Sequence, residues 1–284
     1  MAKICSWRNT MKTLFLILSF LFVSSCSANG EWSGHTMQRE KKVCVVGDTG
    51  MGTKEQDKVA DAMHNHGCTD ILIAGDVIYP SGLISMNDKD FKLKFLDPYK
   101  TLFKKATFYP ALGNHDYYGK QEVWLTIGES YPQIHFPHYW YKFVIGDTCF
   151  FAIDTNWYKI KMYKWLRSEL KKNKGCRKKI VFGHHPYKSS GSHGDANPAR
   201  KLLMRYGFMG KADLYIAGHD HQLSDEGIVR GTRQLISGAG AKLRPLKKNP
   251  EWGVSELGFV SLDLKEMTYT FINYKGEVLY SGGF

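Results

Sequence analysis

The sequence lacks several features that would assign it to a class directly. Its 284 residues contain no Cys-x-x-Cys pair, which argues against a zinc ribbon. They contain no internal repeat and no low-complexity linker. No lysine and arginine tract interleaved with aromatic residues stands out. The formal net charge of +12 is therefore compatible with nucleic acid, anionic lipid or anionic small substrates, and it selects none of them.

There is also no apolar run long enough to span a bilayer. The longest, Leu14 to Val23, covers about 10 residues, whereas a membrane helix needs ~20. Residues 1–25 are therefore interpreted as a cleavable signal, and "VSSC" resembles a bacterial lipobox whose cysteine, Cys26, becomes the lipidated first mature residue. Ordinary cleavage near Ser27 is the alternative. Either product is exported, as a cell-envelope lipoprotein or as a periplasmic or secreted protein, and residues 26–41 then form a tether.

Four cysteines remain beyond Cys26. Cys44 and Cys149 lie in apolar, strand-like runs, where buried thiols without a partner are common. Cys68 and Cys176 each follow a glycine just before a predicted strand. An exported compartment permits disulfides, but the spacing does not assign a pairing.

The body of the chain alternates between strand and helix patterns. A helix is expected after Thr53, a candidate cap with Gln56 three residues on, and it should stop at Gly67; a second amphipathic helix should close at Gly175. From "RQLISGAG" onward the chain consists of short strand patterns without helices. This order predicts one α/β (α+β) domain over residues 42–284, a two-sheet β-sandwich flanked by helices.

Five apolar runs end in a polar cluster that follows a glycine. These runs are "VVGDTG", "IAGDVIY", "ALGNHD", "VFGHHP" and "IAGHDH". In an open α/β sheet, sites form in the crevice beyond the carboxyl ends of the strands. A single Gly-Asp or strand-end histidine is more often a turn or a satisfied polar residue. Five such clusters made of Asp, Asn, His and Tyr indicate a metal site instead.

The order of these motifs resembles the metallophosphoesterase superfamily, whose members hold two metals in a two-sheet sandwich. Most members open with Asp-x-His, whereas this chain has Asp48-Thr49-Gly50 and supplies Tyr79 in "GDVIY". That substitution is similar to the purple acid phosphatases, in which a tyrosinate binds iron(III). The resemblance covers roughly residues 42–284, and "GHHPYKSSGSHG" and "SGAGAKLRP" look most like the small, tartrate-resistant type.

The resemblance implies a complete set of ligands for two metal ions. The first ion would be Fe(III), and the second Fe(II), Zn(II) or Mn(II), ions that suit carboxylate, phenolate and imidazole donors. A bridging carboxylate, Asp76, would be shared between the two ions. The first ion would be held by Asp48, Asp76, Tyr79 and His221, and the second by Asp76, Asn114, His184 and His219.

The resemblance also implies the reaction, which is attack of a metal-bound hydroxide on a phosphomonoester. His115 and His193 match the histidines that donate a proton to the leaving group and, when protonated, attract phosphate. Relatives often have a carboxylate before the second histidine, where this chain has Ser192. Asp116 is expected to orient His115 or to cap its loop, and His185 is treated as a loop side chain.

We therefore expect an exported acid phosphatase that acts on small phosphomonoesters. The expected partners are a small phosphomonoester substrate and, only through a lipid at Cys26, a membrane. The protein is expected to be a monomer. No specific nucleic-acid partner is expected. The loops over residues 81–90 and 242–252 are expected to rim the pocket. The alternatives are a phosphodiesterase or nucleotide-processing member of the superfamily, and a non-catalytic envelope protein that binds iron or phosphate. The hypothesis that the chain is a nucleic-acid-binding module rests on its positive charge alone.

Overall fold

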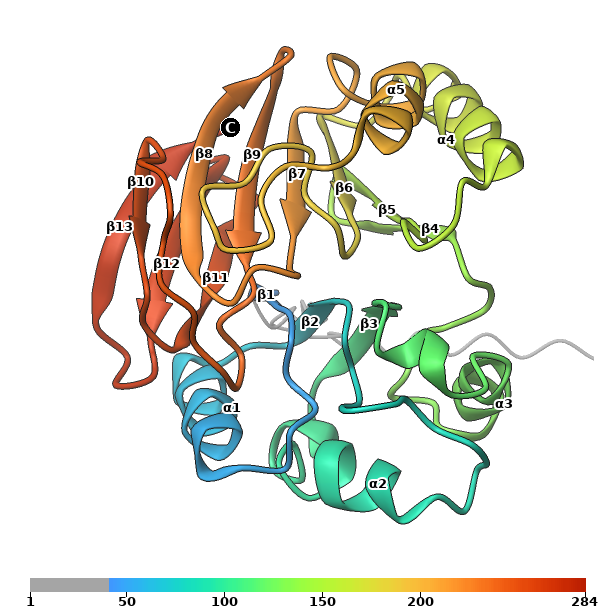
Figure 1. The fold of residues 1–284 in the computed structure, drawn as a ribbon, viewed down its shortest axis with the longest axis vertical. Coiled ribbons are helices and arrows are strands. Elements are labelled where there is room, and N and C mark those ends of the chain that lie inside the picture. Colours follow the sequence, from blue (N-terminus) through green and yellow to red (C-terminus); the bar gives the residue numbers. More distant parts are fainter. Residues whose placement is uncertain (1–40) are drawn as a thin grey trace, which may run out of the picture. The chain divides into compact units, whose positions relative to one another are not determined.

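Two β-sheets form the centre of the computed structural model, which describes residues 41–284 (Figure 1). The expected signal segment, Cys26 and nearly all of the expected tether lie outside the described residues. The six-stranded sheet has the order β13-β12-β11-β1-β2-β3, and the seven-stranded sheet has the order β10-β8-β9-β7-β6-β5-β4. The predicted two-sheet fold flanked by helices is confirmed.

The strands of the first sheet are β1 (Val43–Val46), β2 (Asp70–Ala74), β3 (Thr107–Ala111), β11 (Gly258–Asp263), β12 (Thr268–Asn273) and β13 (Val278–Gly283). Those of the second sheet are β4 (Tyr141–Ile145), β5 (Thr148–Ala152), β6 (Lys178–Phe182), β7 (Leu214–Ala217), β8 (Leu223–Val229), β9 (Thr232–Ser237) and β10 (Trp252–Val254). The α-helices are α1 (Lys54–His66), α2 (Lys89–Phe91), α3 (Val123–Ser130), α4 (Ile160–Lys172) and α5 (Pro198–Gly207). Short helices of other types are η1 (Lys92–Leu96), η2 (Leu102–Lys104) and η3 (Asp116–Tyr118).

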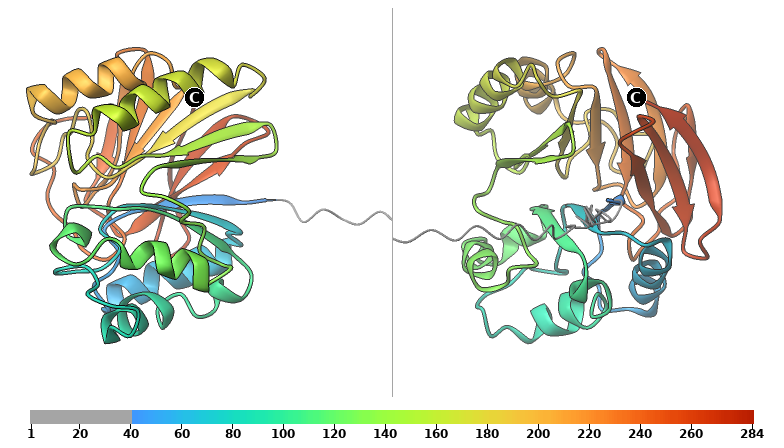
Figure 2. Two further views of the ribbon diagram at one scale, coloured as in Figure 1. Left: turned by 90° about the vertical axis from the view of Figure 1, so that its right-hand side faces the viewer. Right: turned by 180° about the vertical axis from the view of Figure 1, so that it is seen from behind.

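Helices cover the outer face of each sheet. In Figures 1 and 2, α1, α2 and α3 lie on one side of the sandwich, and α4 and α5 lie on the other. The neighbours Phe150 and Phe151 in β5 point to opposite faces, as strand geometry requires. Phe150 joins the core between the sheets, whereas Phe151 packs with the buried faces of α4 and α5.

Two details of the helices differ from the sequence-based expectation. Thr53 stands at the start of α1 without a side-chain cap; the buried Gln56 instead accepts the backbone N–H groups of Met51 and Gly52. The prediction for Gly67 is confirmed, since it ends α1 with a left-handed φ of 87°. Helix α4 ends at Lys172, before the expected Gly175. Helix α3 and strands β8 and β10 were not anticipated.

Two disulfides link the four cysteines of the domain. Cys44 pairs with Cys68, and Cys149 pairs with Cys176. Cys44 and Cys149 are buried in strands, as expected, and the structure assigns the pairing that the sequence had left open. Each bond joins the interior of a strand to the connection that leads into a neighbouring strand. Within residues 41–284, no helix has both the length and the apolar character that crossing a membrane requires.

Candidate metal centre and active site

The site lies where the parallel strands of both sheets end. Strand β1 runs parallel to β2, and β2 to β3; β5, β6 and β7 are likewise parallel neighbours. The loops that leave β1, β2, β3, β6 and β7 carry the five polar clusters expected from the sequence. All seven predicted metal ligands converge there, and hydrogen bonds or ion pairs link them into one network: Asp48, Asp76, Tyr79, Asn114, His184, His219 and His221.

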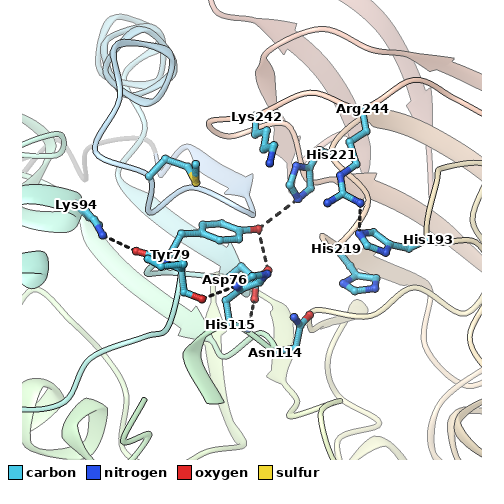
Figure 3. Close-up of a pocket in the computed structure, with 12 residues that line it drawn as sticks. Asp76, Tyr79, Lys94, Asn114, His115, His193, His219, His221, Lys242 and Arg244 are labelled. Carbon is cyan, nitrogen blue, oxygen red and sulfur yellow. Dashed lines mark hydrogen bonds between the residues drawn. The ribbon is translucent and has the colours of Figure 1, made fainter. Parts of the chain in front are cut away.

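Tyr79 lies at the centre of one half of this network (Figure 3). Its hydroxyl is 2.9 Å from Asp48 Oδ1, 2.8 Å from Asp76 Oδ2 and 3.3 Å from His221 Nε2. One phenol oxygen thus contacts three of the other predicted ligands. The side chain is buried, together with both carboxylates.

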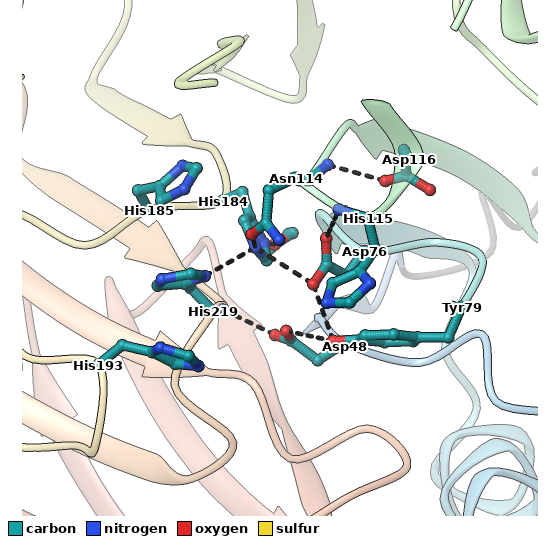
Figure 4. A network of polar contacts seen from close by, with 12 residues as sticks. Asp48, Asp76, Tyr79, Asn114, His115, Asp116, His184, His185, His193 and His219 are labelled. Atoms are coloured by element: carbon teal, nitrogen blue, oxygen red, sulfur yellow. Dashed lines mark hydrogen bonds and ion pairs between the residues drawn. The ribbon is translucent and has the colours of Figure 1, made fainter. Parts of the chain in front are cut away.

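His184 connects the other half of the network (Figure 4). Its Nε2 is 3.0 Å from Asn114 Oδ1, 3.1 Å from His219 Nδ1 and 3.4 Å from Asp76 Oδ2. Its Nδ1 is 3.0 Å from the carbonyl oxygen of Ala74, which fixes the ring orientation. Asp76 therefore faces both halves, as expected of a carboxylate that bridges two ions.

The backbone is held in an unusual conformation at three of these ligands. Asp48, Asp76 and His219 have φ values of 57°, 50° and 71°, in the left-handed region that side chains rarely adopt. Such conformations persist where surrounding contacts enforce them, and they concentrate at functional sites. Gly113 shows how tight the packing is, since a Cβ there would lie 2.0 Å from Asp76 Oδ1.

Asp116 fastens two of the site loops to each other. This fully buried carboxyl accepts the backbone N–H groups of Val77 and Ile78, after β2, and of Gly113, after β3. The expectation that Asp116 caps its own loop is correct, and the additional link to the loop of Tyr79 could not be read from the sequence. The contact holds Asp76 and Asn114 at a fixed separation.

Burial controls the charge state of the site. It raises the pKa of Asp48 and, together with the Asp48 carboxylate, strongly raises the pKa of the Tyr79 hydroxyl. Burial lowers the pKa of His219 to about 2 and that of His221 to about 3, so both imidazoles are neutral in mild acid. His184 is the exception, because the carboxylate of Asp76 outweighs burial and raises the pKa of the ring to about 9.

These residues fit a pair of metal ions. Asp48, Asp76 and His184 each offer one donor atom, and all three atoms lie within 4.8 Å of one another; His184, His185 and His219 form a second such group. Neither Asp48 nor Asp76 pairs with a lysine or arginine within the described residues, although both are buried. Among the described residues, the His184 imidazolium beside Asp76 is the one cationic partner of these buried carboxylates, which leaves a need for further positive charge that bound metal ions would meet. Oxygen and imidazole donors suit iron, zinc or manganese.

The two candidate catalytic histidines flank the ligands but differ in their contacts. His115 Nδ1 lies 2.6 Å from the carbonyl oxygen of Pro80 and acts as donor to it, which leaves Nε2 for the pocket. His193 Nε2 instead accepts a hydrogen bond of 2.7 Å from Arg244 Nη1 (Figure 3). Burial and the positive charge of Arg244 lower the pKa of His193. The positive charge expected at His193 is therefore supplied by Arg244.

A buried acid holds the loop of His193 in place of the missing carboxylate at Ser192. Asp220, the middle residue of "HDH", accepts the backbone N–H of His193 at 2.8 Å and the hydroxyl of Ser189. Asp220 therefore positions a loop that starts from another strand. The sequence offered no signal for this role beyond its place between two predicted ligands.

A pocket of about 290 Å³ opens over the network and is lined by basic side chains. Lys94, Lys242 and Arg244 line it together with Met51 and five of the predicted ligands. The prediction for residues 242–252 is thus confirmed by Lys242 and Arg244. Residues 81–90 do not line the pocket; Pro80 and Lys94 occupy that side instead. Lys94 was missed because its side chain reaches the site from η1, donating to the carbonyl oxygen of Tyr79 at 2.5 Å.

His185 has a structural contact that accounts for one of its ring atoms. Its Nδ1 lies 2.8 Å from Thr155 Oγ1, and the ring is buried beside His184 and His219. Burial and its charged neighbours, His184 first, lower its pKa. The His185 ring therefore packs against the rings of His184 and His219, two of the predicted ligands.

The comparisons with known proteins agree with this geometry. The family model for calcineurin-like phosphoesterases matches residues 41–223. The chain is 30% identical to purple acid phosphatase 7 of Arabidopsis thaliana, over 94% of each chain. It is 26% identical to human tartrate-resistant acid phosphatase type 5, over 78% of this chain and 81% of the relative.

A solved structure agrees at the level of the fold. GAP50, described as the anchor in the inner membrane complex of Plasmodium, superimposes with a TM-score of 0.73 over 86% of this chain and 88% of its own, at 24% identity. The matched motifs, the near-full-length similarity and the converging ligands lead to one assignment. The chain belongs to the calcineurin-like phosphoesterase family and, within it, to the purple acid phosphatases.

Proposed function

We propose that the protein is an exported acid phosphatase that hydrolyses small phosphomonoesters at a dinuclear Fe(III)–M(II) centre, where M is iron, zinc or manganese. One observation carries the proposal: seven oxygen and nitrogen donors from five separate loops form a single, largely buried network around two carboxylates that no lysine or arginine of residues 41–284 contacts. The names of the two curated relatives support an acid phosphatase.

The donor set favours iron(III) at the first position. Burial and two carboxylates oppose ionisation of Tyr79, so only a strongly Lewis-acidic ion would bind it as a phenolate. Bound metal ions would lower the pKa of a water and polarise the phosphoryl oxygens. Asp76 would keep the two ions adjacent, and Asn114 would complete the second position with a neutral oxygen.

The remaining residues bind and orient the substrate. Arg244 and Lys242 place positive charge on the side of the pocket facing His221, where the phosphate dianion would enter. Arg244 also keeps His193 Nε2 occupied, which makes His115 the better-placed donor for the leaving oxygen. The volume of about 290 Å³ suits a small phosphoester.

The test is turnover of p-nitrophenyl phosphate and its bis-ester by metal-loaded protein across an acidic to neutral pH series. We expect the monoester to be preferred with an acidic optimum, and His219→Ala to lose at least about 100-fold in kcat. His138→Ala, in a histidine outside the site, is the matched control. Preference for the bis-ester would indicate a phosphodiesterase, and absence of turnover of either ester would indicate a binding protein.

We also propose export, with a lipid at Cys26, and a monomeric state. The two disulfides support export, because such bonds persist mainly in oxidising compartments. Mass spectrometry of the mature N-terminus tests this proposal. A diacylglyceryl group on Cys26 is the expected result, and a mature protein that retains residues 1–25 would contradict it.

A further inference from the structure

A second charged region lies at the opposite end of the strands from the metal centre. Because the parallel strands carry the site at their carboxyl ends, their starts lie on the face turned away from it. In Figure 2 (left), the blue start of β1 and the green turn between β4 and β5 lie on that side. The connections that enter these starts carry six exposed cations, which we call the basic face: Lys41, Lys42, Lys104, Arg177, Lys211 and Arg230.

The basic face spans both sheets. Arg177, before β6, donates to the carbonyl oxygen of Lys265 in the β11–β12 turn at 3.0 Å. Lys178, the first residue of β6, donates at 2.6 Å to a terminal oxygen of Phe284, after β13. These contacts bring the strand starts of the second sheet against the strand ends and turns of the first, at the end of the molecule where all six cations lie.

Most of this charge is not neutralised. Among the described residues, only Lys41 in the basic face pairs with a carboxylate, Asp70, at 3.5 Å. Lys42 and Lys211 donate to backbone carbonyl oxygens, which leaves their net charge in place. Asp213, an acid in the same region, is engaged by Lys178 and by the backbone N–H of Lys179. The same end also carries three exposed acids, Asp147, Asp263 and Glu266, so the cations of the basic face are in excess but not unopposed.

A pocket in the basic face adds apolar contacts. It has a volume of about 420 Å³ and is lined by Lys211, Ile228, Arg233 and Phe284, among others. Ile228 stands at the tip of the β8–β9 hairpin and is 69% exposed. Arg233 forms ion pairs with Asp225 and Glu251, so Lys211 supplies the positive charge of this pocket that no described carboxylate pairs with. An exposed aliphatic side chain beside an ammonium group suits the interface of a lipid bilayer, where charged headgroups meet apolar acyl chains.

The chain itself joins the domain at this face. Lys41 and Lys42 immediately precede β1, and Cys26 lies 15 residues earlier in the sequence. A connection of that length spans at most about 50 Å when fully extended. A lipid at Cys26 would therefore bring the basic face, and not the catalytic pocket, closest to the membrane.

We propose that the basic face docks on a membrane surface that contains anionic phospholipid, and that the catalytic pocket then faces the aqueous side. This inference goes beyond the proposed phosphatase activity and does not require it. Duplex nucleic acid is the less suitable partner, because its phosphates would contact only the cations and would leave the exposed aliphatic side chain of Ile228 without an apolar partner.

Vesicle co-sedimentation of the mature chain tests the proposal, with Cys26→Ser in every sample to remove lipidation. We expect binding to phosphatidylcholine vesicles that contain about a third phosphatidylglycerol, no binding to pure phosphatidylcholine, and loss of binding at high salt. The triple variant Lys42→Glu, Lys104→Glu, Arg230→Glu should bind about 100-fold more weakly, since each cation near such a surface contributes about fivefold.

The matched control changes net charge equally at another place. Lys89→Glu, Lys161→Glu, Lys164→Glu alters three exposed lysines on α2 and α4 and should keep binding within about threefold. Both triple variants should keep the wild-type melting temperature and turnover. Equal loss of binding in the two variants would overturn the proposal, as would displacement from vesicles by inorganic phosphate, which would place binding at the catalytic pocket. Binding to duplex DNA without binding to vesicles would also overturn it.

Discussion

Replacing Asp116 by asparagine should loosen the metal site without touching a predicted ligand. The side chain accepts three backbone N–H groups, from Val77, Ile78 and Gly113, at 3.1, 3.0 and 2.7 Å. Asparagine has the same shape but only one accepting oxygen. If that oxygen keeps the contacts with Val77 and Ile78, the amide NH2 faces the N–H of Gly113, and two donors then oppose each other.

The expected loss follows from these contacts. One lost hydrogen bond costs about 1 kcal/mol, and a buried N–H left without an acceptor costs about 1–3 kcal/mol, which totals about 2–4 kcal/mol. For a domain of this size, that corresponds to a fall of roughly 5–15 °C in melting temperature. Burial, together with Asp76, raises the pKa of Asp116 to about 7, so at pH 8 the ionised carboxylate itself costs stability in the metal-free protein. Unfolding is therefore measured on metal-loaded protein, in which bound cations would offset that cost and the loss of hydrogen bonds decides the result.

Thermal unfolding followed by circular dichroism, with metal analysis of the same samples, provides the assay. Because Gly113 precedes the predicted ligand Asn114, the content of the second metal should fall along with stability. Asp61→Asn, on the exposed face of α1, is the control and should melt within about 2 °C of the parent. An Asp116→Asn protein with wild-type melting temperature and full metal content would refute the reasoning that this carboxyl fastens two loops.

Three further predictions concern the site directly. The iron-loaded protein should show a broad visible absorption band that Tyr79→Phe removes, and a colourless iron-loaded parent would contradict a phenolate ligand. Gly113→Ala should abolish metal binding, because its methyl group would lie 2.0 Å from Asp76 Oδ1, whereas Gly175→Ala, with nothing within 4 Å and no left-handed φ, should keep the metal. Arg244→Met should lower kcat/KM for phosphomonoesters by about 30–100-fold with an unchanged melting temperature, and equal turnover would remove Arg244 from substrate binding.

The sequence predicted which side chains converge at the site because their positions follow from the direction of the strands that precede them. Each follows an apolar strand and a glycine, and strands that run parallel must end at the same edge. The two-sheet architecture could also be predicted, because strand and helix patterns alternate through most of the chain and short strands without helices follow them. Helix α3 and strands β8 and β10 have weaker sequence patterns and were not predicted.

Contacts between distant loops were not accessible in this way. Lys94 reaches Tyr79 from a helical segment with no motif, and Arg244 contacts His193 across 51 positions of sequence. Asp220 looked like a spacer between two ligands, yet its carboxylate holds the His193 loop. The disulfides belong to the same class, because pairing depends on which strand starts are neighbours in space.

The left-handed backbone at Asp48, Asp76 and His219 limits how this site can be altered by design. Glycine, asparagine and aspartate adopt such angles at the lowest cost, although Arg230 and Met267 also do so in this chain, so a glutamate or cysteine introduced there would add conformational strain to any change in metal preference. Asn114, His184 and His221 carry no such restriction. Efforts to retune the centre toward another ion should begin at those three positions, where a new donor atom can be introduced on ordinary backbone.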